Sequence, residues 1–147
     1  MNLEAKVATA LRNLFSEVTS TFVPVSSFVM CTSTFFPSFI MGKKPKMKIM
    51  QTTHTGELAV RFGRKVRNLM DQKEYKEVFP EVKLQADNKS AGRWETNKGG
   101  EYFAAGVGGA ITGRGADLLI IDDPHSEQDA LSPSAFDNAY EWYSSGS

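Results

Sequence analysis

The chain has 147 residues, which is one domain at most or part of a larger one, and its 41% hydrophobic and 23% charged residues are typical of a globular protein. Its 17 basic and 17 acidic side chains give a formal net charge of zero, which excludes a globally basic nucleic-acid-binding protein and leaves only local patches. The single cysteine, Cys31, excludes an internal disulfide and suits a reducing compartment. The two histidines, His54 and His125, lie far apart and give no metal-ligand spacing.

The N-terminal part of the chain is rich in apolar and hydroxyl side chains. Residues 1–17 are predicted to form an amphipathic helix, because their apolar residues recur at spacings of three and four. Residues 18–42 carry no charged side chain and approach the length of a membrane span. Pro24, Pro37 and many serines and threonines interrupt this stretch, which favours a segment buried in the protein or covered by a partner over a membrane span.

The middle of the chain begins with a basic turn. This turn, Lys43–Lys46, has two interpretations: it is a solvated loop, or it contacts a phosphate backbone. Residues 47–53 are predicted to form a strand, and a helix follows from near Thr55, with Glu57 in the first turn, where the helix dipole favours a carboxylate. The apolar face of this helix consists of Leu58, Phe62, Val66, Leu69 and Met70.

The outer face of that helix carries a basic stripe. Its members are Arg61, Arg64 and Lys65, whose spacing places them side by side. Such a stripe is either a solvated surface or a contact to DNA. A second short helix is predicted over residues 72–78, ending before Pro80.

The following segments are predicted to be an irregular stretch, a hairpin and, near the chain end, a helix. Residues 81–92 show no period and are predicted to be irregular. Residues 93–96 and 101–105 flank Asn-Lys-Gly-Gly, which predicts a β-hairpin with a glycine turn. Ser132 is a suitable N-cap, and Pro133 a suitable first residue, for the last helix. The apolar face of that helix consists of Phe136, Ala139, Tyr140 and Tyr143.

Between the hairpin and the last helix, the apolar run Leu118–Ile121 ends in two carboxylates, Asp122 and Asp123. The shortness of the run and the glycine and proline around it favour a strand buried on both faces over a buried helix. Ligands of α/β sheets bind beyond the carboxyl ends of the strands, so the two carboxylates predict a nucleotide site. Asp122 would hold Mg²⁺ through its water shell, and Asp123 would orient or polarise the attacking water. An ordinary solvated turn is the alternative interpretation.

A glycine-rich loop precedes this strand. It lacks the third glycine of the dinucleotide-binding pattern and leads into a strand, where that pattern needs a helix. The chain also lacks the sequence GxxxxGK[ST]. Arg114 stands between two glycines, where it could reach a phosphate bidentately or remain a solvated turn residue. The order of the elements (strand, helix, helix, hairpin, strand, helix) is typical of an α/β sheet with crossover helices.

Taken in order, several segments of the chain resemble the large terminase subunit of tailed bacteriophages, a family that packages viral DNA into a preformed capsid. These segments are residues 54–84, 90–124 and 140–146. The sequence GxxTGRGADLLIIDDP within the second segment is the most specific part. The resemblance covers roughly Phe35 to Ser145, and it divides the chain into a divergent N-terminal segment, 1–34, and a partial terminase-like ATPase domain, 35–147.

The resemblance implies an α/β fold of the P-loop NTPase type (RecA/ASCE-like), with a mainly parallel central sheet flanked by helices. It implies that Leu118–Asp122 is the Walker B strand, with Asp122 on the water shell of Mg²⁺ and Asp123 at the position of the catalytic carboxylate. Asp123 is one methylene shorter than the glutamate that many members of the wider superfamily carry there. Arg114 would be an arginine finger that acts on a neighbouring subunit.

The family couples ATP hydrolysis to the translocation of DNA into a capsid. The resemblance therefore implies ATP and Mg²⁺ as cofactors. The implied partners are double-stranded viral DNA, the portal protein, the small terminase subunit and further copies of the chain in a ring, with Arg61, Arg64 and Lys65 as candidate DNA contacts. The expected location is the host cytoplasm, with transient docking on the procapsid and no membrane.

Departures from the family pattern bear on activity. The place of Walker A holds residues 22–29, which contain neither glycine nor lysine, so the β- and γ-phosphates of ATP would lose their main ligands. The strand that follows Walker B in the family and the nuclease domain have no counterpart in the sequence. We therefore expect the chain alone to show little or no ATPase activity. The alternatives are a truncated, non-catalytic fragment that binds DNA or terminase, and a degenerate prophage relic.

Overall fold

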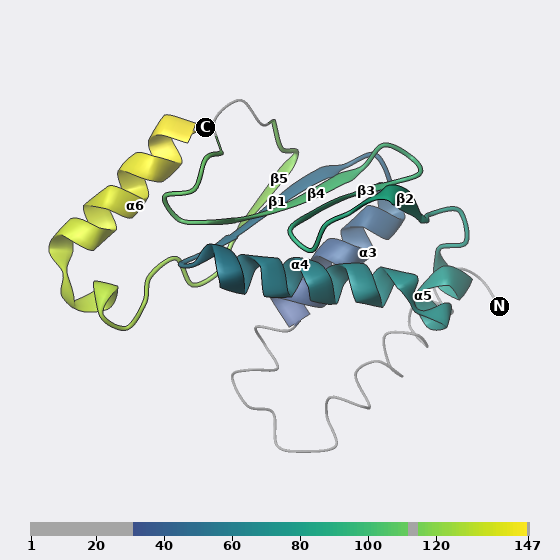
Figure 1. Cartoon of the computed structure of the whole chain (residues 1–147), viewed down its shortest axis with the longest axis horizontal. Coiled ribbons are helices and arrows are strands. Elements are labelled where there is room, and N and C mark those ends of the chain that lie inside the picture. Colours follow the sequence, from purple (N-terminus) through teal and green to yellow (C-terminus); the bar gives the residue numbers. More distant parts are fainter. Residues whose placement is uncertain (1–30, 112–114, 147) are drawn as a thin grey trace, which may run out of the picture.

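A computed structural model describes residues 31–111 and 115–146, which form an α/β structure around a five-stranded sheet (Figure 1). The strands are β1 (Lys48–Thr53), β2 (Leu84–Lys89), β3 (Arg93–Thr96), β4 (Glu101–Gly106) and β5 (Leu118–Ile121). In the order β2-β3-β4-β1-β5, β1 is parallel to β4 and β5, and β3 is antiparallel to β2 and β4. The α/β class is therefore confirmed, but the sheet is mixed, and its parallel part is β4, β1 and β5.

Most elements predicted for the described residues are confirmed. The bounds of β1, β3, β4 and β5 agree with the predicted strands to within one residue. The prediction of an irregular stretch over 81–92 is wrong, because β2 lies within it and pairs antiparallel with β3, Leu84 opposite Thr96. The predicted helix over 1–17 and residues 18–30 of the uncharged stretch lie outside the described residues.

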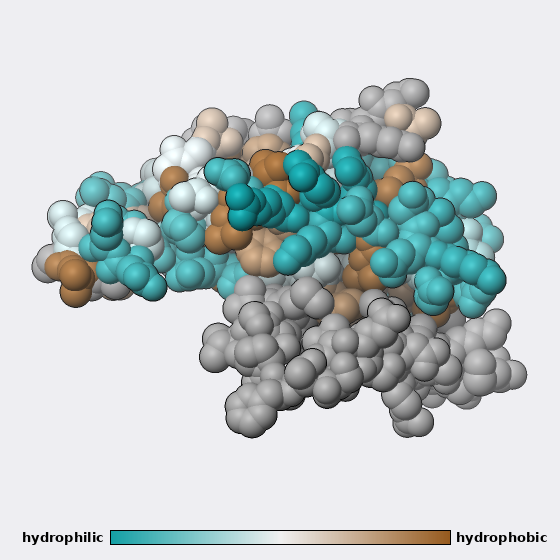
Figure 2. Space-filling view, turned by 60° about the horizontal axis from the view of Figure 1, so that its bottom comes forward, coloured by the Kyte–Doolittle hydropathy of each residue, from teal (hydrophilic) through white to brown (hydrophobic). Residues whose placement is uncertain are grey.

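Helices cover one face of the sheet. They are α3 (Phe36–Lys43), α4 (Gly56–Asp71) and α5 (Lys73–Val78). A continuous apolar core joins them to the sheet, with Met41 of α3, Val66 of α4 and Tyr75 of α5 in one cluster with Ile49 and Trp94. The outer surface over α4 and α5 is mainly hydrophilic (Figure 2), as expected for helices that bury only one side.

The described part of the uncharged stretch is buried against this core. It forms a π-helical turn (Cys31–Phe35) that continues directly into α3. Ser33, Ser38 and Met41 are 0%, 3% and 0% exposed, which agrees with the expected burial of this stretch. Pro37 stands in the first turn of α3, where a missing backbone N–H costs no helical hydrogen bond. Within residues 31–111 and 115–146, no helix is long and apolar enough to cross a membrane.

Helix α4 is the longest of the described helices, and the sequence predicts both its start and its buried side. Thr55 is its N-cap, and the hydroxyl of Thr55 accepts a hydrogen bond from the backbone N–H of Leu58 at 3.2 Å. The buried residues of α4 are Ala59, Phe62, Gly63, Val66, Leu69 and Met70. The apolar spacing therefore predicts this face correctly, apart from Leu58, which is only half-buried.

Replacement of Thr55 by alanine is expected to lower the free energy of unfolding by about 1 kcal/mol, because one N–H in the first turn of α4 loses its acceptor. Urea denaturation followed by far-UV circular dichroism measures this change. Thr55→Ser is the matched control and should stay close to the unsubstituted protein, since it keeps the hydroxyl. Equal losses in the two variants would mean that the methyl group, and not the cap, matters.

Two stacked aromatic side chains lie at the centre of the core. The rings of Trp94 and Tyr102 are parallel to within 4°, with centroids 4.9 Å apart, and both residues are 0% exposed. The indole N–H of Trp94 donates to the carbonyl of Gly63 at 3.2 Å, and the Tyr102 hydroxyl donates to Oε1 of Gln51 at 2.6 Å. Burial raises the pKa of Tyr102 far above its ordinary value, so the hydroxyl remains a donor.

The opposite face of the sheet carries a smaller apolar cluster. Its buried residues are Met50, Ala105 and Ile111. Trp142 of α6 (Pro133–Gly146) packs against this cluster, and its indole N–H donates to the carbonyl of Gly109 at 2.8 Å. The aromatic members of the predicted apolar face of α6 are largely exposed: Phe136 48%, Tyr140 71% and Tyr143 42%. The last helix is therefore confirmed, but it packs on the sheet through Trp142 instead of that face.

Candidate functional site

The parallel strands β4, β1 and β5 end at the same edge of the sheet (Figure 1). Backbone hydrogen bonds continue beyond the strands, since Asp122 N donates to Thr52 O at 2.9 Å and Val107 N donates to Thr53 O at 2.8 Å. The edge therefore brings together the glycine-rich loop after β4, His54 after β1, and Asp122 and Asp123 after β5. In α/β sheets, this edge is the usual place of a ligand.

The carboxylate of Asp122 is paired with a buried hydroxyl. The half-buried Asp122 accepts a hydrogen bond through Oδ2 from the hydroxyl of Ser33, in the π-helical turn before α3. Ser33 is 0% exposed, so its hydroxyl is held among packed side chains. Sequence reasoning did not single out Ser33, because 89 positions separate it from Asp122 and no short motif joins the two.

Asp123 has different surroundings from Asp122. It is exposed, and its backbone lies in the left-handed region with φ of 48°, which aspartate tolerates better than most residues. The carbonyl of Asp123 accepts a hydrogen bond from the backbone N–H of His54 at 3.0 Å, and Nδ1 of the His54 ring lies 3.3 Å from the same oxygen. The backbone of Asp123 is thus tied to the end of β1, while its carboxylate faces solvent.

A third carboxylate, Asp129, is affected electrostatically by both histidines. Hydrogen bonds from the hydroxyl and the backbone N–H of Ser126 hold the pKa of Asp129 below its ordinary value, and the charges of His125 and His54 lower the pKa further. No group of three or more His, Cys, Asp or Glu within the described ranges could hold a metal ion.

The glycine-rich loop has a packing role at this edge. A Cβ atom on Gly106 would overlap the backbone N of Gly56, the first residue of α4, and would lie 2.8 Å from the backbone C of Thr55. Only a glycine at this position lets the end of β4 approach the start of α4 so closely. Gly108 adopts a φ of 81°, which also favours glycine. Glycines in this loop are thus required by backbone geometry.

The remaining candidate residues lie elsewhere. Arg61, Arg64 and Lys65 are exposed on α4, and the guanidinium of Arg61 is 2.7 Å from the Glu57 carboxylate, so part of the charge of the stripe is compensated. Lys65 Nζ lies 5.6 Å from the centroid of the Phe62 ring. A DNA contact at this stripe stays a prediction. Arg114 lies outside the described residues, and its assignment as an arginine finger stays a prediction as well.

The fold and this edge define an α/β protein with a mixed sheet and a hydroxyl–carboxylate pair at the carboxyl ends of parallel strands. Comparisons with protein-family models, with curated proteins and with solved structures find no match.

Proposed function

We propose that the chain is part of a viral DNA-packaging ATPase, the large terminase subunit, and that Asp122 and Ser33 contribute to its magnesium site. The observation that carries the proposal is the hydrogen bond between the Ser33 hydroxyl and the Asp122 carboxylate, next to the ends of β1 and β5. P-loop NTPases hold Mg²⁺ with a hydroxyl from the phosphate-binding loop and the aspartate at the end of the Walker B strand. The pair in this chain offers the same two ligand types.

The donor chemistry of this pair fits Mg²⁺, which prefers hard oxygen ligands and keeps several of its waters. Because the pair supplies a single carboxylate, Asp122 would act through the water shell of the ion. When bound, Mg²⁺ neutralises charge on the phosphates of ATP. Asp123 is exposed beside the pair with its backbone fixed by His54, and this placement supports a role in orienting the attacking water.

Under this proposal the partners are double-stranded viral DNA, the portal protein, the small terminase subunit and further copies of the chain in a ring. Arg114 would act on the ATP of a neighbouring subunit. The chain would work in the host cytoplasm, docked on the procapsid during packaging. The P-loop NTPase relationship is supported by the parallel order β4-β1-β5 with two carboxylates after β5.

Asp122→Asn is expected to weaken Mg²⁺-dependent binding of ATP by about tenfold or more, the range typical of losing a carboxylate that acts through the shell of a metal ion. Isothermal titration calorimetry of the whole chain with ATP, with and without Mg²⁺, measures this change. The matched control is Asp117→Asn, which removes the same charge just before β5, at the other end of the strand. This control should leave the Mg²⁺ dependence unchanged.

The same titration separates the proposed function from its alternatives. Absence of Mg²⁺-dependent binding, or equal effects of the two asparagine variants, would argue against a magnesium site at Asp122. We expect turnover by the isolated chain to be slight, because the Walker A position, residues 22–29, has neither glycine nor lysine. ATPase activity that disappears in Asp122→Asn would refute this expectation.

A non-catalytic fragment that binds DNA or terminase is the second candidate function. The exposure of Arg64 and Lys65 on α4 favours it, because these cations are accessible to a phosphate backbone. Under this candidate, the chain binds DNA without any dependence on Mg²⁺ and ATP. Combined measurement of nucleotide binding and DNA binding therefore distinguishes the two.

A further inference from the structure

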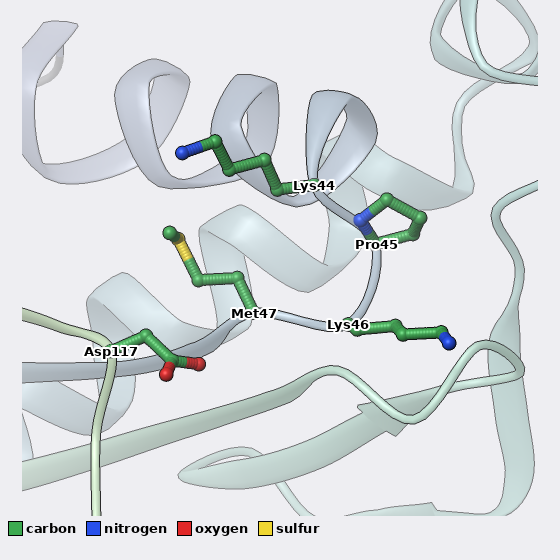
Figure 3. A pocket seen from close by; sticks show the side chains of 5 residues that line it. All are labelled: Lys44, Pro45, Lys46, Met47 and Asp117. Carbon is green, nitrogen blue, oxygen red and sulfur yellow. The ribbon is translucent and has the colours of Figure 1, made fainter.

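An open pocket of about 600 Å³ lies at the amino-terminal end of β1, opposite the edge that carries Asp122. It is lined by Lys44, Pro45, Lys46, Met47 and Asp117 (Figure 3). The turn before β1 and the residue before β5 thus form one concave surface. The six residues of β1 separate this pocket from the candidate magnesium site by about 16 to 20 Å, given the rise of a strand.

The backbone of the lysine turn, which we define as Lys43–Lys48, is held firmly in place. Lys44 N donates to Ile40 O at 2.7 Å, and Met47 N donates to Lys44 O at 2.9 Å. The hydroxyl of Thr96 donates to Pro45 O at 3.0 Å. The lysine turn therefore presents its side chains from a fixed backbone, and a site that is formed beforehand binds with a smaller entropic cost.

The lysine turn concentrates positive charge on a protein with no net charge. All four of its lysines are exposed: Lys43, Lys44, Lys46 and Lys48. None of the four forms an ion pair with another described residue, whereas Arg61, Lys73, Lys76, Arg93 and Lys98 each do. The one carboxylate in the pocket, Asp117, accepts a hydrogen bond from the backbone N of Lys48 at 2.8 Å.

We propose that the lysine turn binds the phosphate backbone of a nucleic acid. Figure 3 shows the side chains of Lys44 and Lys46 pointing in opposite directions, so their ammonium groups do not converge on one point. Charges spread in this way suit successive phosphates of a chain better than a single phosphate ion. The choice of DNA as the ligand rests on the proposed packaging function. The test of this inference uses no nucleotide, so the lysine turn and the magnesium site can be refuted separately.

The test is the salt dependence of binding to a short fluorescent DNA duplex, followed by anisotropy with the whole chain. Each lysine–phosphate contact adds about 0.9 to the slope of log affinity against log salt. Between about 50 and 200 mM salt, the unsubstituted protein should therefore lose about tenfold more affinity than Lys44→Gln/Lys46→Gln, which lacks two contacts. Lys44→Arg/Lys46→Arg keeps both charges and should keep the slope.

The matched control is Lys73→Gln/Lys76→Gln, which removes the same charge from the exposed side of α5. It should leave the salt slope close to that of the unsubstituted protein. Loss of the slope in Arg64→Gln/Lys65→Gln but not in Lys44→Gln/Lys46→Gln would move the site to α4 and overturn the proposal. Displacement of the duplex by inorganic phosphate at constant ionic strength would indicate a small-anion site and would also overturn it, as would absence of duplex binding by the unsubstituted protein.

Discussion

Replacement of Trp94 by alanine is expected to lower the free energy of unfolding by about 4 kcal/mol, at the upper end of single-residue effects. Trp94 is 0% exposed, stacks on Tyr102 and donates its indole N–H to the carbonyl of Gly63. Alanine would leave a cavity between α4 and β4 and would take the donor from a buried carbonyl. Urea denaturation followed by far-UV circular dichroism gives the loss directly.

Two further variants show which part of Trp94 matters. Trp94→Phe keeps a ring against Tyr102 but removes the donor to Gly63 O, so we expect a loss of about 1 to 2 kcal/mol. Trp142→Ala, on the other face of the sheet, is the matched control, and since Trp142 is only half-buried its loss should be about 1 to 2 kcal/mol. A Trp94→Ala loss no larger than that of Trp142→Ala would show that the stacked pair is not the centre of the core.

Elements with local signals could be predicted from the sequence. The apolar residues of α4 recur with the helical period and follow a threonine cap, so both its start and its buried side are encoded within one segment. The hairpin of β3 and β4 carries its own glycine turn, and Gly99 adopts a φ of 86° there. β5 is a short apolar run between turn residues. In each case the information lies within a few residues of the element.

Features that depend on distant pairing could not be predicted. β2 shows no apolar alternation, and its place beside β3 follows from the pairing of Leu84 with Thr96. The aromatic spacing of α6 indicates an apolar face, but the contact of Trp142 with the loop after β4 determines which side packs. The Ser33–Asp122 pair joins positions 89 apart, so only the folded chain reveals a partner for the Asp122 carboxylate.

Asp122 and the lysine turn lie at opposite ends of the same pair of strands. β1 begins at Lys48, in the lysine turn, and ends beside Asp122, while β5 runs parallel to it from just after Asp117 to just before Asp122. A nucleotide at one edge and a phosphate backbone at the other would therefore be connected by two hydrogen-bonded strands. Under the proposed function, these two strands would link the nucleotide site physically to the DNA contact, and a change in DNA affinity on nucleotide binding would measure their coupling.

Gly106→Ala is expected to lower the free energy of unfolding by about 3 kcal/mol, because the added methyl group would overlap the backbone at the start of α4. Neither neighbour can move cheaply, since Thr55 and Gly56 are backbone partners that begin a helix of 16 residues. The relaxation available is a displacement of α4 away from the end of β4. Thermal and urea unfolding measure the cost.

The matched control is Gly115→Ala, in the same glycine-rich segment, where an added Cβ would meet no atom within 4 Å. It should change stability by no more than about 0.5 kcal/mol, as for an ordinary surface substitution. If α4 shifts in Gly106→Ala, His54 shifts with it, and so does the backbone of Asp123 that His54 holds. Mg²⁺-dependent ATP binding should then weaken in the folded variant but not in Gly115→Ala. Equal stability of the two variants would mean that the loop adapts without moving α4. Position 106 would then not require a glycine.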